Sequence, residues 1–184
     1  KEFCTKNNYE YILWDADACN EIIKEYPDYI DLYNSVRFSI MKVDIIRFII
    51  LHKYGGLYAD LDTIPNCEKL KASTFIIAKK FGLKRTLYEM EILQSIKGHP
   101  YLLSFLDYVK TQIEEKDKLQ IYTKWKCRYV YQTTGPHSLT RFLKDKEDID
   151  EYNLNEPLTL DNSLNLRGNE DFISYPSCSY LDKM

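Results

Sequence analysis

Residues 43–65 read VDIIRFIILHKYGGLYADLDTIP, and this stretch predicts a helix, a stop and a short strand in succession. Apolar residues recur at steps of three and four through Ser35–Tyr54, the spacing that places them on one face of a helix. Gly55 can adopt the left-handed backbone conformation that ends a helix. Leu57–Leu61 then indicates a short, mostly buried strand, which Thr63-Ile64-Pro65 prevents from continuing. The stretch therefore ends beyond the carboxyl end of a strand, where open α/β sheets bind their ligands.

Two carboxylates, Asp60 and Asp62, stand one residue apart at the end of this predicted strand. Side chains two residues apart in a strand point to the same face, so we expect both carboxylates to project together while Leu61 points into the core. Two carboxylates this close repel each other unless a cation lies between them. Mn²⁺ and Mg²⁺ prefer carboxylate oxygens and often leave their other positions to water and phosphate. The pair therefore predicts a divalent metal ion whose coordination is completed by a phosphorylated ligand.

A second pair of opposite charges precedes the carboxylates, on the predicted helix. Asp44 and Arg47 are three residues apart and therefore share a helix face. Arg47 stands among isoleucines and a phenylalanine, where a guanidinium exposed to solvent is not expected. Two interpretations remain open: the arginine pairs with Asp44 inside the protein, or it binds a phosphate or carboxylate of a ligand.

The rest of the chain alternates predicted strands and helices. This alternation indicates an α/β domain with a mainly parallel sheet flanked by helices, and 184 residues are enough for one such domain, residues 1–184. The expected strands are Tyr9–Trp14, Thr74–Ala78, Arg128–Gln132 and, at an edge, Asp171–Tyr175; the expected helices are Ala18–Tyr26, Pro100–Glu115 and one from Pro136 to Lys144.

Composition and charge exclude several classes of protein. The net charge of −3 does not indicate a nucleic-acid-binding protein. No apolar run is long enough for a membrane span. The five cysteines are scattered and match no zinc-site spacing, which favours reduced thiols and a cytoplasmic location. A Golgi-type lumen is the alternative, for a chain that has lost an N-terminal anchor.

Residues 43–62 resemble the core signature of sugar transferases that carry a D-x-D motif, closest to glycosyltransferase family 32. Three flanking pieces resemble the same family: Tyr11-Ile12-Leu13-Trp14-Asp15, Gly98-His99-Pro100 and Thr134-Gly135-Pro136. The resemblance implies a GT-A-type, Rossmann-like fold and a hexosyltransferase that depends on Mn²⁺ or Mg²⁺. It further implies a UDP- or GDP-hexose donor, a glycan, glycolipid or protein acceptor, and transfer with retention of the anomeric configuration.

The resemblance also assigns roles to individual residues. Asp62 is expected to bind the metal ion directly, and Asp60 to bridge the metal ion and the donor; both are the expected catalytic residues. Asp44 and Arg47 are expected to hold the sugar and nucleotide parts of the donor. Tyr58 is expected to line the donor pocket. Trp14 is placed at the donor site, as a core residue beside it or as a contact to the nucleotide.

The chain departs from the family pattern at both ends, and two other functions were compared with the transferase. It lacks the family's usual first strand and its late segment near a tryptophan, so we expect either a domain truncated at both ends or a minimal member of the family. The first alternative is a non-catalytic domain that binds nucleotide-sugar or glycan. The second is a phosphatase of the haloacid-dehalogenase type, whose D-x-D-x-T motif Asp60-Leu61-Asp62 approaches, although Ile64 occupies the last position.

Overall fold

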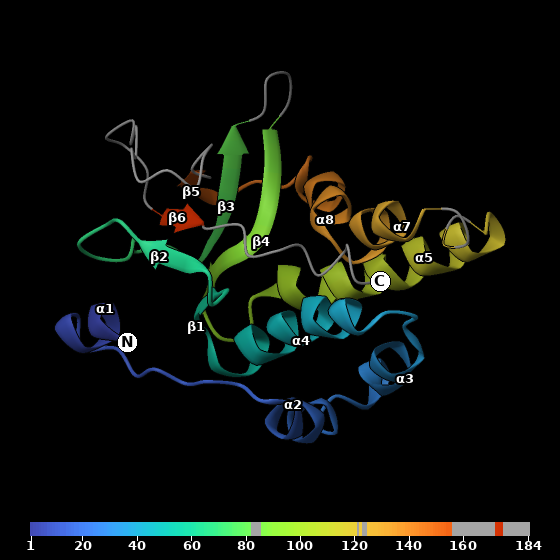
Figure 1. Ribbon diagram of the computed structural model, residues 1–184, viewed down its shortest axis with the longest axis horizontal. Helices are drawn as coiled ribbons and strands as arrows, with labels where there is room; N and C mark the ends of the chain where they lie inside the picture. Colours follow the sequence, from blue (N-terminus) through green and yellow to red (C-terminus); the bar gives the residue numbers. More distant parts are fainter. Residues whose placement is uncertain (82–85, 121, 123–124, 156–171, 175–184) are drawn as a thin grey trace.

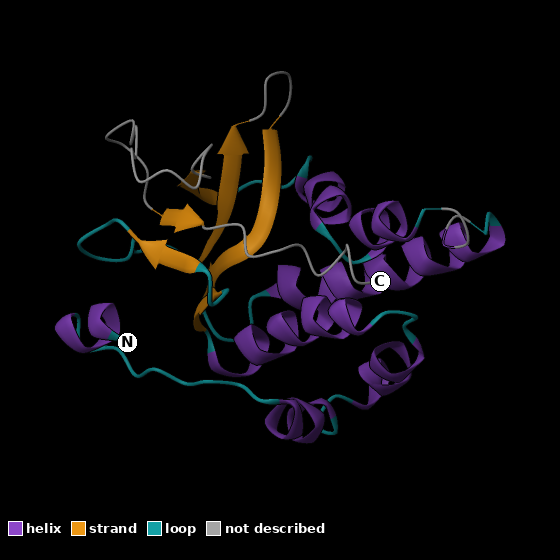
Figure 2. Ribbon diagram, in the orientation of Figure 1, coloured by secondary structure: helices purple, strands orange, loops and turns teal. Residues whose placement is uncertain are grey.

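The structure, a computed structural model, describes residues 1–81, 86–120, 122, 125–155 and 172–174, and it is a mixed α/β molecule. A group of helices packs beside one sheet, as Figure 1 and Figure 2 show. The helices are α1 (Glu2–Lys6), α2 (Ala16–Ile23), α3 (Pro27–Ser35), α4 (Ser39–Tyr54), α5 (Pro100–Lys118), α7 (Lys126–Thr133) and α8 (Pro136–Leu143). The strands are β1 (Gly56–Ala59), β2 (Thr63–Pro65), β3 (Phe75–Phe81), β4 (Thr86–Ser95), β5 (Asp150–Asn155) and β6 (Phe172–Ser174).

The sheet is mixed, with the strand order β1-β4-β3-β5-β6-β2. The pairs β1–β4, β3–β4 and β2–β6 are antiparallel, whereas β3–β5 and β5–β6 are parallel. The prediction of a mainly parallel sheet is therefore wrong. Only residues 82–85 separate β3 from β4, which is too short for the crossover that a parallel pair requires.

The two outermost strands of the sheet are consecutive in the chain. β1 stands at one end of the strand order and β2 at the other, and only residues 60–62 lie between them. The predicted metal-binding carboxylates therefore occupy the short turn in which the chain passes from one end of the strand order to the other. This turn leaves the two aspartates outside both strands.

A β-bulge in β4 lies beside the end of β1. Ile77 of β3 pairs with Leu93 of β4, but the next residue, Ala78, pairs with Glu89, so residues 90–92 are extra in the ladder. On the other edge of β4, Ala59 pairs with Ile92. A bulge interrupts the ladder and leaves backbone groups available to side chains, and bulges are frequent next to active sites.

Helix α4 is the interior helix of the molecule. Its residues Asp44 through Leu51 are all buried, and the Phe48 ring packs against that of Phe105 on α5 at 4.6 Å between centroids. The main hydrophobic core joins α4 with residues of α2, α3, α5, α8, β3 and β4. Because α4 has little exposed surface, its polar side chains must find partners inside the protein.

Several predicted elements are confirmed. The structure contains the helix that ends at Gly55, the strand around Thr74–Ala78, and the helices that begin at Pro100 and Pro136. The C-terminal strand is also present as β6, although it lies between β5 and β2 rather than at an edge. None of the helices in the described ranges combines the length and apolarity needed to cross a membrane.

Other predicted elements are wrong. Tyr9–Trp14 is extended but pairs with no strand in the described part of the chain, and its Leu13 side chain is 63% exposed. Arg128–Gln132, predicted as a strand, lies in helix α7, with Tyr129, Val130 and Thr133 buried on one face. Helices α1 and α3 and strands β2, β4 and β5 were not predicted; Thr63-Ile64-Pro65, expected only to stop the preceding strand, forms β2 itself.

Candidate functional site

The two aspartates of the D-x-D motif lie in a tight turn. β1 ends at Ala59, the Asp60 N–H donates to the Glu91 carbonyl of β4 at 2.9 Å, and the Thr63 N–H donates back to the Asp60 carbonyl at 3.1 Å. The prediction that Leu61 points into the core is wrong, because the chain has left the strand at that residue and its side chain is 82% exposed. Asp60 and Asp62 remain neighbours in the turn, and both are half-buried.

The guanidinium of Arg47 connects α4 to this turn. Arg47 is only 3% exposed, and its guanidinium donates from Nη2 to Asp44 at 3.1 Å and from Nη1 to the Met90 carbonyl at 2.6 Å. Nη1 also lies 3.5 Å from Asp60 Oδ1, and Nε donates to the carbonyl of Val43. The Met90 carbonyl belongs to the β4 bulge, so the bulge supplies an acceptor that fixes the position of Arg47.

Asp44 has a second partner far away in the sequence. Its Oδ2 accepts a 2.7 Å hydrogen bond from the hydroxyl of Thr134, which follows α7. One carboxylate oxygen therefore faces Arg47 and the other faces Thr134, and both side chains of this second contact are buried. Thr134 thereby connects the α7–α8 junction to the motif on α4.

Tyr58 completes the group. Its hydroxyl donates to Asp60 Oδ1 at 2.7 Å, and the guanidinium of Arg47 lies over its ring at 4.6 Å from the centroid. The five side chains that contact one another in this way form what we call the Arg47 cluster: Asp44, Arg47, Tyr58, Asp60 and Thr134.

Burial dominates the electrostatics of the cluster. It raises the pKa of Asp44 to about 6, although the charge of Arg47 and the hydrogen bond from Thr134 act in the opposite direction. Burial likewise raises the pKa of the Tyr58 hydroxyl, which is therefore the hydrogen-bond donor to Asp60 at neutral pH. The less buried end of the cluster is the turn, where the carboxylates of Asp60 and Asp62 lie.

The donor set at this end fits a divalent cation that is only partly coordinated by protein. Among the residues that the structure describes, no three histidine, cysteine, aspartate or glutamate side chains are arranged as a metal site. Both contacts of the Asp60 carboxylate use Oδ1, so Oδ2 can face a cation. Two carboxylate ligands with the remaining positions left to water and phosphate are what Mg²⁺ commonly accepts.

The structure brings together most of the residues that the sequence predicted, but not all. Asp44, Arg47, Tyr58 and Asp60 are in contact, and Asp62 adjoins them in the turn. Trp14 instead packs its ring on Tyr54, at 5.5 Å between centroids and at the opposite end of α4 from Asp44. Its predicted nucleotide contact stays a prediction.

Sequence reasoning missed three members of the site. Thr134 was noted only as part of a T-G-P motif that precedes a helix, and nothing in its local sequence indicates a partner on α4. The Met90 carbonyl and Glu91 belong to an unpredicted strand. Glu91 is half-buried, and its charge acts on Arg47, so its carboxylate lies near the cluster.

Comparisons with known proteins agree with the predicted resemblance. Residues 2–80 match the family described as "Glycosyltransferase sugar-binding region containing DXD motif". Over 106 residues the chain is 35% identical to the mannosyl phosphorylinositol ceramide synthase SUR1 of Saccharomyces cerevisiae, and over 100 residues it is 33% identical to the inositol phosphoceramide mannosyltransferase 3 of Schizosaccharomyces pombe. These alignments cover 56% and 52% of this chain but only 27% of each relative. The chain therefore spans about a quarter of the length of these relatives.

Two further proteins are similar over more of the chain. The initiation-specific alpha-1,6-mannosyltransferase of Candida albicans is 35% identical over 164 residues, which covers 72% of this chain and 43% of that protein. The solved structure of the PaToxG glycosyltransferase covers 77% of this chain and 60% of its own, with 17% identity and a TM-score of 0.49. The predicted resemblance to DXD-motif glycosyltransferases is confirmed by the family match and the sequence relatives, which favour neither the phosphatase nor the non-catalytic alternative.

Proposed function

We propose that this protein, whose residues 2–80 match the DXD-containing sugar-binding region of glycosyltransferases, transfers a hexose from a UDP- or GDP-sugar to an acceptor hydroxyl. Mannose is the first sugar to test, because two of the relatives above are named mannosyltransferases. We further propose a GT-A-type fold, dependence on Mn²⁺ or Mg²⁺, and retention of the anomeric configuration. The observation that carries the proposal is the buried Arg47, which contacts Asp44 on one side and Asp60 on the other.

In this proposal the aspartates of the turn bind the cation, and the other side chains of the Arg47 cluster fix the position of the turn. Asp62 and Asp60 would bind the metal ion, which when bound would neutralise the negative charge of the diphosphate leaving group. Arg47 and the hydroxyl of Tyr58 both contact Asp60 Oδ1, so they orient the carboxylate before any ligand arrives. Such preorganisation removes part of the ordering cost from donor binding.

The other residues of the cluster would position the sugar. Asp44 is fixed by Arg47 and Thr134, and as a carboxylate it can accept hydrogen bonds from hexose hydroxyls. Arg47 would act mainly by holding Asp44 and Asp60 in place, because its donors are already used inside the protein. Tyr58 would line the donor pocket, and Trp14 would support it from the far end of α4.

The names of the three fungal relatives suggest an acceptor class. Two are named for inositol phosphoceramide or its mannosylated product, and one for initiating alpha-1,6-mannosylation. For this chain we propose an acceptor that presents a polyol or sugar hydroxyl, as a glycolipid or a glycan. A protein acceptor remains within the predicted range.

The experiment that tests the function measures donor binding and turnover together. The protein is incubated with GDP-mannose, and in parallel with other GDP- and UDP-hexoses, with Mn²⁺ or with EDTA; nucleotide release and thermal stabilisation are recorded. We expect one donor to raise the melting temperature only with metal and to be slowly hydrolysed. The variant Asp62→Ala should abolish the metal-dependent stabilisation, while circular dichroism shows an intact fold.

The matched control is Asp17→Ala, which removes an exposed aspartate from the first turn of α2. It should leave donor binding unchanged. Unchanged donor affinity in Asp62→Ala would contradict the proposed role of the turn. Metal-dependent binding without any nucleotide release would instead indicate a non-catalytic binding domain.

A further inference from the structure

A surface hollow of about 430 Å³ lies where α7 meets α8. Its lining residues are Arg128, Tyr131, Gln132 and His137, and we call it the α7–α8 hollow. The two helices are joined by Thr134 and Gly135, and the Gly135 N–H donates to the Val130 carbonyl at 2.9 Å. This bond closes the turn, so the lining residues of α7 and α8 are held on one rigid junction.

The hollow contains a cationic side chain that has no anionic partner. Arg128 is exposed and forms no ion pair with any residue that the structure describes. The other arginines in the described ranges are engaged: Arg37 with Asp117, Arg47 with Asp44, and Arg141 with Gln112. Within the described part of the chain, Arg128 is thus the arginine that remains available for an anion from outside.

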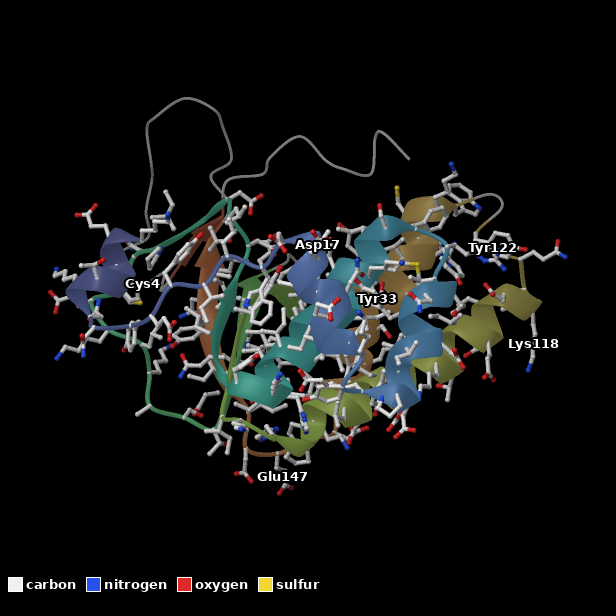
Figure 3. The ribbon with its side chains drawn as sticks, turned by 90° about the horizontal axis from the view of Figure 1, so that it is seen from below. Cys4, Asp17, Tyr33, Lys118, Tyr122 and Glu147 are labelled. Atoms are coloured by element: carbon white, nitrogen blue, oxygen red, sulfur yellow. The ribbon has the colours of Figure 1, made fainter. Side chains whose placement is uncertain are left out.

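The chain around the hollow favours an anionic ligand. From Lys118 to Lys144 the sequence contains no aspartate or glutamate, whereas lysine and arginine recur through it, in a protein whose net charge is −3. In Figure 3, Lys118 and Tyr122, near the start of this stretch, lie together at the end of the molecule opposite Cys4. The hollow therefore sits in a locally basic segment of an otherwise acidic protein, which attracts anions.

The hollow also adjoins the Arg47 cluster through the chain. Thr134, whose hydroxyl holds Asp44, lies between Gln132 and His137, which both line the hollow. His137 is exposed, and its ring lies 5.6 Å from that of Tyr131. A polar group bound in the hollow would contact the same junction that positions the proposed donor carboxylate.

We propose that the α7–α8 hollow binds the phosphate of the acceptor, so that the acceptor is a phosphorylated polyol or sugar rather than a neutral glycan. The identification of the ligand as the acceptor rests on the proposed function, whereas the anion site itself does not. Arg128 would form charge-assisted hydrogen bonds to the phosphate oxygens, and its fork of donors suits that group. Gln132 and His137 would add donors, and the ring of Tyr131 would face the polyol.

The first test measures binding of myo-inositol 1-phosphate to the protein by titration calorimetry. We expect binding that weakens with added salt, and that weakens about tenfold or more in Arg128→Gln, since one charge-assisted contact is lost. His137→Gln should have a smaller effect in the same direction. Equal affinity in Arg128→Gln and the unchanged protein would overturn the inference.

The matched control is Lys144→Gln. It removes one positive charge from the same basic segment, but from the far end of α8, outside the hollow. We expect affinity close to that of the unchanged protein. A loss equal to that of Arg128→Gln would mean that general charge, and not the hollow, binds the anion, and would also overturn the inference.

A second arm distinguishes a lipid headgroup from a free phosphate. Sedimentation with vesicles of phosphatidylcholine alone is compared with vesicles that also contain phosphatidylinositol. Binding to the phosphatidylinositol vesicles that requires Arg128 indicates a lipid acceptor, whereas Arg128-dependent binding of the soluble phosphate alone indicates a soluble one. Absence of Arg128-dependent binding to both probes contradicts the inference.

Failure of this inference can be told from failure of the proposed function. Suppose that Asp62→Ala abolishes metal-dependent donor binding but Arg128→Gln does not change phosphate binding. The proposed transferase function would then stand, and the proposed acceptor site would be wrong. If phosphate binding requires Arg128 but no donor binds, the anion site would be supported and the proposed transferase function would be wrong.

Discussion

The Arg47 cluster and the α7–α8 hollow meet at Thr134, and they differ in what their charges contact. In the cluster, Arg47 is buried and each of its nitrogens has a protein acceptor. In the hollow, Arg128 is exposed and has no ion-pair partner within the described ranges. Arg47 therefore holds protein groups in place, whereas Arg128 is available to bind a ligand. Substitutions in the two regions should therefore affect different measurements.

The largest effect is expected from Arg47→Met. This change leaves Asp44 buried without its cation, and breaking a buried ion pair by removing one partner costs about 3–5 kcal/mol. The free energy of unfolding, measured by urea denaturation, should fall by that amount, and donor binding should weaken even with saturating metal.

A double-mutant cycle gives the control for this prediction. Adding Asp44→Leu to Arg47→Met removes the stranded carboxylate, so part of the lost stability should return. If the single variant loses less than about 1 kcal/mol, which is the range of an exposed pair, Arg47 is not the buried connector that the structure shows.

Part of the Arg47 cluster could be predicted from the sequence, because some of its residues lie close together along the chain. Asp44 and Arg47 are three residues apart on one helix, and the two aspartates follow within one strand and turn, so local periodicity and the motif were sufficient. Thr134 lies 90 residues from Asp44, and no local pattern reports a contact at that separation. Its position depends on how α7 and α8 pack, which a single sequence does not specify.

The errors in the fold also have local causes. Arg128–Gln132 is rich in aromatic and β-branched residues and therefore resembles a strand, but Tyr129, Val130 and Thr133 occupy one helical face in the structure. β4 was missed because its bulge at residues 90–92 breaks the alternation of apolar and polar side chains that marks a strand. In both places tertiary packing decided against the local preference.

A smaller loss is expected from Thr134→Val, which removes the hydroxyl at the meeting point of the two regions. One oxygen of the buried Asp44 then lacks its donor, which should cost about 1–3 kcal/mol of unfolding free energy. Thr133→Val is the matched control, because that buried hydroxyl bonds only carbonyls of its own helix, those of Tyr129 and Val130. Metal-dependent donor binding should weaken in Thr134→Val and remain in Thr133→Val. Equal donor affinity in both variants would show that the Thr134 hydroxyl does not contribute to donor binding.

The pH dependence of stability should report the buried carboxylate. Burial raises the pKa of Asp44 to about 6 in the folded state, so the folded protein holds this proton more tightly than the unfolded chain does. The resulting cost to stability grows as the pH rises from about 4 to about 6 and is constant above. Lowering the pH from 7 to 5 should thus stabilise the protein by about 1 kcal/mol relative to Asp44→Asn. A relative loss over this interval would have the wrong sign and would contradict the burial of an ionisable Asp44.

The smallest change in stability is expected from Arg128→Gln, and this is what separates the two regions most clearly. Arg128 is exposed and contacts no carboxylate in the described ranges, so its loss should change the free energy of unfolding by less than about 0.5 kcal/mol. The same variant should lose phosphate binding. Arg128 forms no ion pair in the described ranges and so adds little to folding stability, but its charge is free to bind an anionic ligand. Urea denaturation and calorimetry on one preparation measure both quantities. A loss of stability comparable to that of Thr134→Val would show that Arg128 supports the junction itself, and its effect on phosphate binding would then be indirect.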